Sequence, residues 1–146
     1  MVAVSAPDVR VPDSHLDLLR RPICAVFTTL LPSGQPQSSL VWVDHDGECA
    51  RVNTTLERSK GRCLVADRRA SLLVVDPDDA SRFLQIRGVV ELVQEGALEH
   101  LDDLTRRYTS HPCFYGHVHP TAQRDRETRV ICRLHARRVQ CDAIHR

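Results

Sequence analysis

The most informative part of the chain is the segment Arg51-Val52-Asn53-Thr54-Thr55-Leu56-Glu57-Arg58-Ser59-Lys60-Gly61-Arg62. Residues 48–55 are expected to form a β-strand, which ends in two threonines. After a short turn, residues 57–68 are predicted to form a helix, because one of its faces is polar and the other is apolar. Hydroxyl side chains and the start of a helix therefore meet at one point of the chain.

The first turn of this helix carries three cations within five residues. The helix dipole favours cations at the C-terminus, so a cluster at the N-terminus is unfavourable unless an anion joins it. Helix N–H groups, hydroxyls and guanidinium groups are good phosphate ligands. A solvated basic helix face is the alternative interpretation. The residues that would form a phosphate site are Thr54, Thr55, Arg58, Ser59, Lys60 and Arg62.

Two further strands are expected before this segment. Residues 23–31 are apolar and β-branched, and residues 37–43 follow a turn at 32–36 that contains proline and glycine. A second turn at 44–47 ends in Asp-Gly, which is a strong hairpin signal. We expect these two strands and strand 48–55 to form an antiparallel meander.

Three more strands are expected after the segment, at 70–75, 83–94 and 128–134, with an optional extension of the last one through 139–143. Gly88 lies inside the second of these and predicts a bulge or bend. Six mostly antiparallel strands with short helices predict a mainly β, α+β fold. Closing such a sheet into a small barrel removes exposed sheet edges.

The helices and the domain boundaries follow from the remaining pattern. A helix over 12–21 is ended by Pro22, and a helix over 97–110 carries leucines at helical spacing. Residues 1–11 have no periodic signal and are predicted to be a flexible N-terminal arm. Residues 12–146 are predicted to form a single domain.

Composition excludes several classes of protein. The chain has 146 residues, of which 42% are apolar and 27% charged, as in one ordinary globular domain. A net charge of +1 gives no bulk attraction to nucleic acid, and no apolar run is long enough for a membrane helix. The first 20 residues hold three aspartates and no apolar core, so we expect a cytoplasmic protein with six free cysteines.

The stretch His111-Pro112-Cys113-Phe114-Tyr115-Gly116-His117-Val118-His119 is expected to be irregular, within a loop over 111–127. Its histidines and cysteine could bind zinc, or a histidine could ligate haem. The interpretation we favour is a loop that covers a cofactor or a partner subunit, because long loops in compact domains tend to be lids or binding loops. No catalytic residue and no metal ligand is assigned.

Four segments together resemble the pyridoxamine-phosphate-oxidase-like split β-barrel family. These are Leu31-Pro32-Ser33-Gly34-Gln35-Pro36-Gln37; Leu40-Val41-Trp42-Val43-Asp44-His45-Asp46-Gly47-Glu48; Thr54-Thr55 with Arg58-Ser59-Lys60 and Ala66-Asp67-Arg68-Arg69-Ala70-Ser71-Leu72; and Ile86-Arg87-Gly88-Val89-Val90-Glu91-Leu92. The resemblance covers about residues 13–95, and the strand over 129–139 fits the last strand of the family. The short, arginine-rich chain is most similar to the actinobacterial-type branch that uses the deazaflavin coenzyme F420.

The resemblance implies a six-stranded split β-barrel, a homodimer and two cofactors at its interface. It implies that Thr54, Thr55, Arg58 and Lys60 hold the cofactor phosphate, with Ser59 and Arg62 nearby. The candidates for contact with the ring system are Gln37, Ser38, Ser39, Val41 and Asn53, with Asp76, Pro77 and Asp78 near the site and Trp42 as either a ring neighbour or a core aromatic. The sequence departs from the family pattern at Cys63, where asparagine is common, and at 67–69, where Asp-Pro-Arg is common.

The activity that the resemblance implies is hydride transfer between coenzyme F420 and a conjugated small molecule of the enone, quinone or bilin type. The cofactor supplies the difficult chemistry, so no acid–base pair is expected. FMN is the alternative cofactor, and a flavin, deazaflavin or haem carrier without turnover is the alternative of another class. The acidic tail of F420 favours it over FMN, because several arginines could bind that tail: Arg58, Arg62, Arg68 and Arg69.

Overall fold

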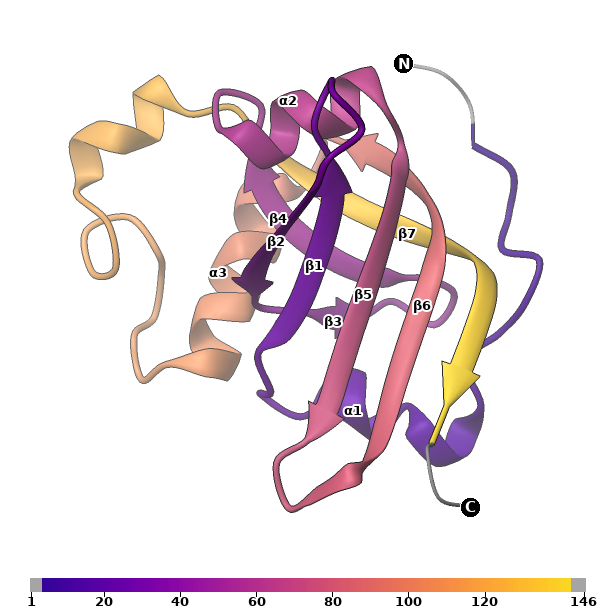
Figure 1. Cartoon of the computed structure of the whole chain (residues 1–146). Coiled ribbons are helices and arrows are strands. Elements are labelled where there is room, and N and C mark those ends of the chain that lie inside the picture. Colours follow the sequence, from indigo (N-terminus) through magenta and orange to yellow (C-terminus); the bar gives the residue numbers. More distant parts are fainter. Residues whose placement is uncertain (1–3, 143–146) are drawn as a thin grey trace.

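The computed structural model describes residues 4–142 (Figure 1). One antiparallel sheet curls into a half-barrel, and short helices lie around it. This arrangement confirms the prediction of a mainly β protein with short helices. The elements in chain order are η1 (Asp13–His15), α1 (Asp17–Arg20), β1 (Ala25–Leu30), β2 (Pro36–Val41), β3 (Asp44–His45), β4 (Ala50–Thr55), α2 (Ser59–Ala66), β5 (Arg69–Asp76), β6 (Asp79–Val93), α3 (Ala97–Tyr108), η2 (Thr121–Arg126) and β7 (Arg129–Cys141).

The sheet has seven strands within the described residues, not the six predicted. The additional strand is β3, which was expected to be part of a turn. Asp44 and His45 pair with Arg51 and Ala50, so the chain reverses only after them. The Asp46 carboxylate accepts hydrogen bonds from the next backbone N–H groups, and this side-chain turn replaces the expected Asp-Gly hairpin turn.

The predicted meander of the first three long strands is confirmed for the first two and wrong for the third. The strand order is β2-β1-β5-β6-β7-β4-β3, so β2 pairs with β1 while β4 pairs with β7. Strand β2 is therefore at one edge of the curled sheet, and β4 lies near the other edge. A hairpin signal between strands predicts local pairing, but long-range pairing with β7 has taken its place here.

Strands β6 and β7 are long and form the centre of the sheet (Figure 1). Their register shifts between Arg87 and Gly88, which confirms the bulge predicted at this glycine. A side chain at Gly88 would lie 2.0 Å from the carbonyl oxygen of His135, so the close approach requires glycine. Strand β7 extends to Cys141, in agreement with the optional extension, of which position 143 lies outside the described residues.

The core fills the concave side of the sheet. Inward residues alternate along the strands, and the largest fully buried ones include Phe27, Leu72 and Ile86. Helix α3 packs on β7 and β4, and α2 packs on β1 and β4. The predicted helix over 12–21 is instead a 3₁₀ turn followed by the single turn of α1. In the described residues, no helix has the length and apolar character needed to cross a membrane.

The segment before η1 makes specific contacts with β7. The backbone N–H of Asp8 donates to the carbonyl oxygen of Ala136 at 2.9 Å. The Arg137 guanidinium donates to the carbonyl oxygens of Ala6 and Ser5 at 2.8 and 3.1 Å. These bonds hold residues 5–8 beside β7.

Candidate functional site

The end of β4 and the start of α2 are held together by short-range contacts. Thr55 is fully buried, and its hydroxyl accepts a hydrogen bond from the backbone N–H of Arg58 at 3.2 Å. A side chain at Gly61 would lie 2.0 Å from the carbonyl oxygen of Thr55. Only glycine therefore allows the first turn of α2 to lie directly on the end of β4. This close packing brings the helix N-terminus to the strand ends.

A polar pocket of about 240 Å³ lies at this point, between strands from the two margins of the sheet. It is lined by seven residues that the sequence analysis predicted and by two that it did not. The predicted ones are Gln37, Ser39, Asn53, Thr54, Arg58, Ser59 and Lys60, and the others are Thr29 and Arg129. Ser59 Oγ donates to Gln37 Oε1 at 2.9 Å and so links α2 to β2. Strands β2 and β4 are far apart in the strand order, but the sheet curls so that they lie on two sides of one pocket.

The charges at this pocket are predominantly positive. Burial lowers the pKa of Lys60, and the neighbouring charges of Arg58 and Arg129 lower it further. A half-buried ammonium group beside two guanidinium groups is unfavourable without an anion. The pocket is consequently suited to a ligand that carries a phosphate or another anion.

Arg129, at the start of β7, was not found from the sequence. Its side chain is 9% exposed. Its Nε donates to the Tyr115 hydroxyl at 2.9 Å, Nη1 donates to Asn53 Oδ1 at 3.4 Å, and the guanidinium lies 4.8 Å from the Phe114 ring centre. Within the described residues, Nη2 is buried without a hydrogen-bond partner. Buried donors are normally paired. This nitrogen could therefore donate a hydrogen bond to an acceptor oxygen of a ligand.

Glu127 is an internal anion beside these cations. Its side chain is 7% exposed and lies 3.4 Å from Arg58 Nη2 and 3.6 Å from Arg129 Nη2. His119 Nε2 lies 3.6 Å from the other carboxylate oxygen. Neither oxygen has a hydrogen bond within the described residues, so the contacts are electrostatic. An anionic ligand bound to Arg58 and Arg129 would therefore lie near the Glu127 carboxylate, which already contacts both guanidinium groups.

A second, more apolar pocket of about 280 Å³ adjoins the first one. Asn53, Arg58, Lys60 and Arg129 line both pockets. The apolar wall is formed by Cys24, Leu40, Val41, Trp42, Leu101, Leu104, Phe114 and Val118. The polar and apolar pockets together provide an anion site next to a surface on which a flat ring could lie.

Trp42 forms the aromatic part of this wall. Its ring stacks on Tyr108 at a centroid distance of 5.5 Å and meets the edge of Phe114 at 6.3 Å. Phe114 and Val118 belong to the loop that the sequence analysis singled out, so that loop covers one side of the pocket. The same loop brings Cys113 Sγ and His117 Nδ1 to 3.4 Å, but it does not add a third metal ligand among the described residues.

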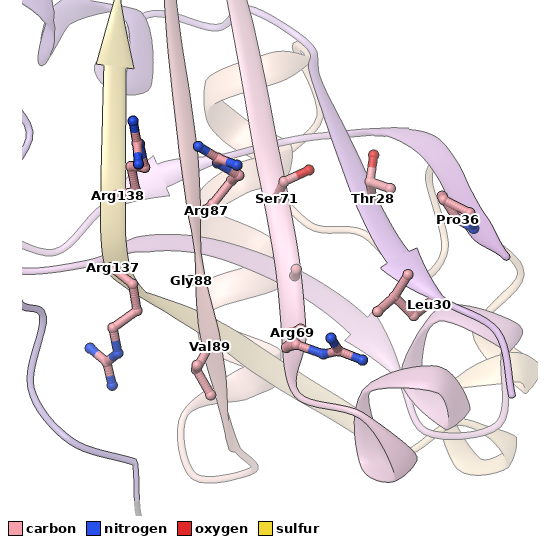
Figure 2. Close-up of a pocket in the computed structure, with 11 residues that line it drawn as sticks. Thr28, Leu30, Pro36, Arg69, Ser71, Arg87, Gly88, Val89, Arg137 and Arg138 are labelled. Atoms are coloured by element: carbon pink, nitrogen blue, oxygen red, sulfur yellow. The ribbon is translucent and has the colours of Figure 1, made fainter. Parts of the chain in front are cut away.

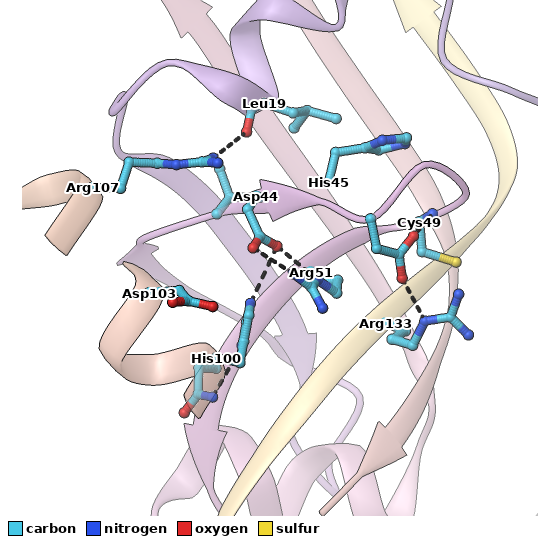
Figure 3. A network of polar contacts seen from close by, with 12 residues as sticks. Leu19, Asp44, His45, Cys49, Arg51, His100, Asp103, Arg107 and Arg133 are labelled. Carbon is cyan, nitrogen blue, oxygen red and sulfur yellow. Dashed lines mark hydrogen bonds and ion pairs between the residues drawn. The ribbon is translucent and has the colours of Figure 1, made fainter. Parts of the chain in front are cut away.

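Asn53 is oriented by a buried polar network, of which Figure 3 shows Asp44, Arg51 and His100. Its Nδ2 donates to the carbonyl oxygen of Ala97 at 2.8 Å and to His100 Nδ1 at 3.1 Å. His100 Nε2 then donates to Asp44 Oδ1 at 3.2 Å, and Arg51 binds both oxygens of the same carboxylate. Burial alone would raise the pKa of Asp44, but the hydrogen bonds from His100 and Arg51 lower it to about 2. The network uses the Asn53 amide nitrogen, and the amide oxygen Oδ1 accepts a hydrogen bond from Arg129.

Several predicted site residues lie outside the pockets. Ser38 is on the opposite face of β2, where its hydroxyl is 2.8 Å from that of Thr28. Thr55 is buried beneath the turn, and Arg62 is exposed one turn further along α2. Arg69, which was considered for an acidic tail, pairs with Asp67 and lines a different groove.

Asp76, Pro77 and Asp78 are at the opposite end of the sheet from α2 (Figure 1). Strand β5 begins just after α2 and runs away from it, so its end is roughly 25 Å away at 3.3 Å per residue. There the Asp76 carboxylate pairs with Arg82 at 2.9 Å and supports the β5–β6 turn. Within this chain, these three residues do not reach the pocket.

Comparisons with known proteins bear on both the fold and the pocket. The profile of the family described as Pyridoxamine 5'-phosphate oxidase matches residues 11–141. No curated protein sequence matches the chain. A solved structure named F420 Reductase is 30% identical with a TM-score of 0.76, and the alignment covers 89% of this chain and 98% of that chain.

Two further structures are similar at lower identity. A conserved hypothetical protein from Mycobacterium tuberculosis is 24% identical with a TM-score of 0.70, covering 97% of this chain and 89% of that chain. A heme binding protein from Mycobacterium smegmatis is 21% identical with a TM-score of 0.58, covering 91% of this chain and 55% of that chain. At these identities the similarity concerns the fold alone.

Proposed function

Because this chain belongs to the pyridoxamine 5'-phosphate oxidase family, we propose that it is an oxidoreductase dependent on the deazaflavin coenzyme F420. Its substrate would be a conjugated small molecule that accepts a hydride, of the enone, quinone or bilin type. The similarity to the structure named F420 Reductase supports this choice of cofactor, since it extends over 98% of that chain.

The observation that carries the proposal is the cationic pocket between β2, β4, α2 and β7. Arg58, Lys60 and Arg129 converge there, and a buried guanidinium nitrogen of Arg129 has no hydrogen-bond partner among the described residues. A phosphate group would supply acceptor oxygens for this nitrogen and counter-charge for Lys60. The residues present therefore fit the phosphate that both F420 and FMN carry.

The apolar pocket next to it fits the ring system. Trp42, Leu101 and Phe114 form an apolar wall, and Gln37, Ser39 and Val41 share one face of the edge strand β2. When bound, the cofactor supplies the hydride chemistry. The chain holds the phosphate, orients the ring and keeps the site dry. No side chain is assigned to proton delivery, which would come from solvent.

The first test is a pair of fluorescence titrations of the cofactor-free protein, one with F420 and one with FMN. Tighter binding of F420 is the expected result. Tighter binding of FMN would overturn the cofactor assignment but leave the oxidoreductase proposal intact. If neither binds, the phosphate role of Lys60 and Arg129 is wrong.

Turnover separates an enzyme from a carrier. The protein loaded with reduced F420 should oxidise it in the presence of at least one member of an enone, quinone and bilin panel. Single-turnover measurements at high protein concentration make a slow reaction visible. Binding of F420 together with a flat panel would favour a carrier role.

We also propose a homodimer that forms through the outer face of the sheet. Leu40, Val26 and Leu73 are in register across β2, β1 and β5, and Leu40 is 72% exposed. Beside this apolar row lies an open groove of about 620 Å³, into which Arg87 and Arg138 project (Figure 2). Sedimentation equilibrium should give a dimer, and Leu73→Glu, a change outside both pockets, should give a monomer. Val65→Glu, at an exposed position on α2, is the matched control.

A further inference from the structure

Three side chains of the types that ligate metals lie close together where the β3–β4 turn is next to β7. They are Glu48 and Cys49 of the turn and His135 of β7, and their ligand atoms lie within 4.8 Å of one another. This cluster is separate from the cationic pocket, because Cys49 precedes the first residue of β4 whereas Thr54 and Thr55 are its last ones. Among the described residues, no other group of three such ligands converges.

His135 is buried and oriented in the way that a metal-binding histidine is. Its side chain is 4% exposed, and its Nε2 lies 2.9 Å from the Glu91 carboxylate. The ionised carboxylate accepts a hydrogen bond from Nε2, so in the neutral imidazole Nε2 carries the proton and Nδ1 keeps its lone pair. Nδ1 is buried without a hydrogen-bond partner among the described residues. A carboxylate that orients a histidine in this way is typical of metal sites.

The surrounding charges favour a cation. The carboxylates of Asp46, Glu48 and Glu91 lie around the cluster, and Arg133 is the cation that pairs with two of them. Asp46 Oδ1 accepts the backbone N–H groups of Glu48 at 2.9 Å and Cys49 at 2.7 Å, which holds both ligands in place. Figure 3 shows Cys49 next to Arg133 at the margin of the polar network. Three carboxylates and one guanidinium leave the site negative.

We propose that Glu48, Cys49 and His135 bind one zinc ion, with Glu91 as the positioning residue of His135. A set of one sulfur, one nitrogen and one oxygen ligand suits Zn²⁺ and does not suit Mg²⁺ or Ca²⁺, which prefer oxygen ligands. Cys49 binds as the thiolate, and its proton passes to solvent. Three protein ligands leave the fourth tetrahedral position to water. The ion would fasten the β3–β4 turn to the centre of the sheet.

Zinc titration of the chelator-treated full chain tests the site. Calorimetry should show one tight Zn²⁺ per chain, and Co²⁺ should give the thiolate-to-cobalt charge-transfer band of a cysteine ligand. Glu48→Gln changes an exposed side chain, so folding is preserved. It should weaken Zn²⁺ binding by at least about tenfold, because losing even an outer-shell partner of a metal ligand costs about 10–100-fold in affinity. Cys49→Ala should abolish the charge-transfer band.

Two control variants keep the result specific. Cys113→Ala removes the cysteine of the Cys113–His117 pair, and Glu95→Gln changes an exposed glutamate outside the cluster. Both should bind Zn²⁺ and Co²⁺ as the unmodified chain does. Loss of the charge-transfer band in Cys113→Ala, unchanged Zn²⁺ affinity in Glu48→Gln, or absence of binding by the unmodified chain would each overturn the proposal. None of these outcomes depends on F420 binding.

Discussion

Arg129 of β7 lies opposite Thr55 of β4 in the antiparallel register, and its guanidinium lines the same pocket as Lys60 of α2. Two cations far apart in the sequence thereby face one cavity. The pairing of β4 with β7 is what brings these cations to one pocket, since α2 alone supplies only part of its positive charge.

Replacing Arg129 should weaken cofactor binding. Arg129→Gln removes the charge but keeps a donor for Tyr115, and the expected loss is roughly 1.5–3 kcal/mol, the scale of a hydrogen bond to a charged group. Fluorescence titration with F420 measures it. Arg126→Gln, at an exposed position on η2, is the matched control and should have no effect. Equal dissociation constants for the two variants would remove Arg129 from the site.

Lys60→Ala is expected to weaken cofactor binding by a similar amount, roughly 1.5–3 kcal/mol, because its ammonium group would pair with the phosphate. Arg62→Ala, two residues further on the same helix and exposed, is the control. Circular dichroism should show both variants folded. A larger effect from Arg62 than from Lys60 would place the phosphate outside the pocket.

Glu127→Gln is expected to strengthen the binding of anions. The carboxylate lies 3.4 Å from Arg58 and 3.6 Å from Arg129, so it repels a phosphate held by the same two groups. The affinity for inorganic phosphate should rise in Glu127→Gln, most clearly at low ionic strength. Calorimetry at two salt concentrations measures the change. Weaker phosphate binding would mean instead that Glu127 is needed to orient the arginines.

The lowered pKa of Asp44 should make the free energy of unfolding sensitive to acid. Folding lowers its pKa from 3.8 to about 2, so its stabilising contribution is present above pH 3.8 and is lost as the pH falls through 2. The loss amounts to about 2 kcal/mol. Urea unfolding from about pH 5 down to pH 2 should show a smaller loss in Asp44→Asn than in the unmodified chain. Asp125→Asn, an exposed change, is the control, and an identical slope for Asp44→Asn would refute the prediction.

Gly61→Ala should destabilise the protein. The added methyl group would lie 2.0 Å from the carbonyl oxygen of Thr55, so α2 must move away from β4. Overpacking of this kind costs about 1–3 kcal/mol. Val65→Ala, at a 57% exposed position on the same helix, is the control. Thermal unfolding should separate the two variants, and F420 binding should weaken in Gly61→Ala because the helix start is displaced.

Part of the site could be predicted without the structure. The family resemblance implied Gln37, Ser39 and Val41, which share one face because side chains alternate along a strand. Lys60 follows from the concentration of cations at a helix start. Ser38 shows the limit of this reasoning, since the resemblance does not say which face of the strand is used, and the structure turns its hydroxyl toward Thr28.

The remaining features depend on which strands are neighbours. Hydrogen bonding between backbones is the same for any two strands, so local patterns cannot choose β7 over β2 as the partner of β4. That choice positions Arg129 in the pocket and brings His135 to Cys49. Local sequence was sufficient for the six longer strands, the Gly88 bulge and the cations of α2, because these arise from contacts between near neighbours. Packing of the whole chain was required for the pairing, because it is selected by the burial of side chains from every strand at once.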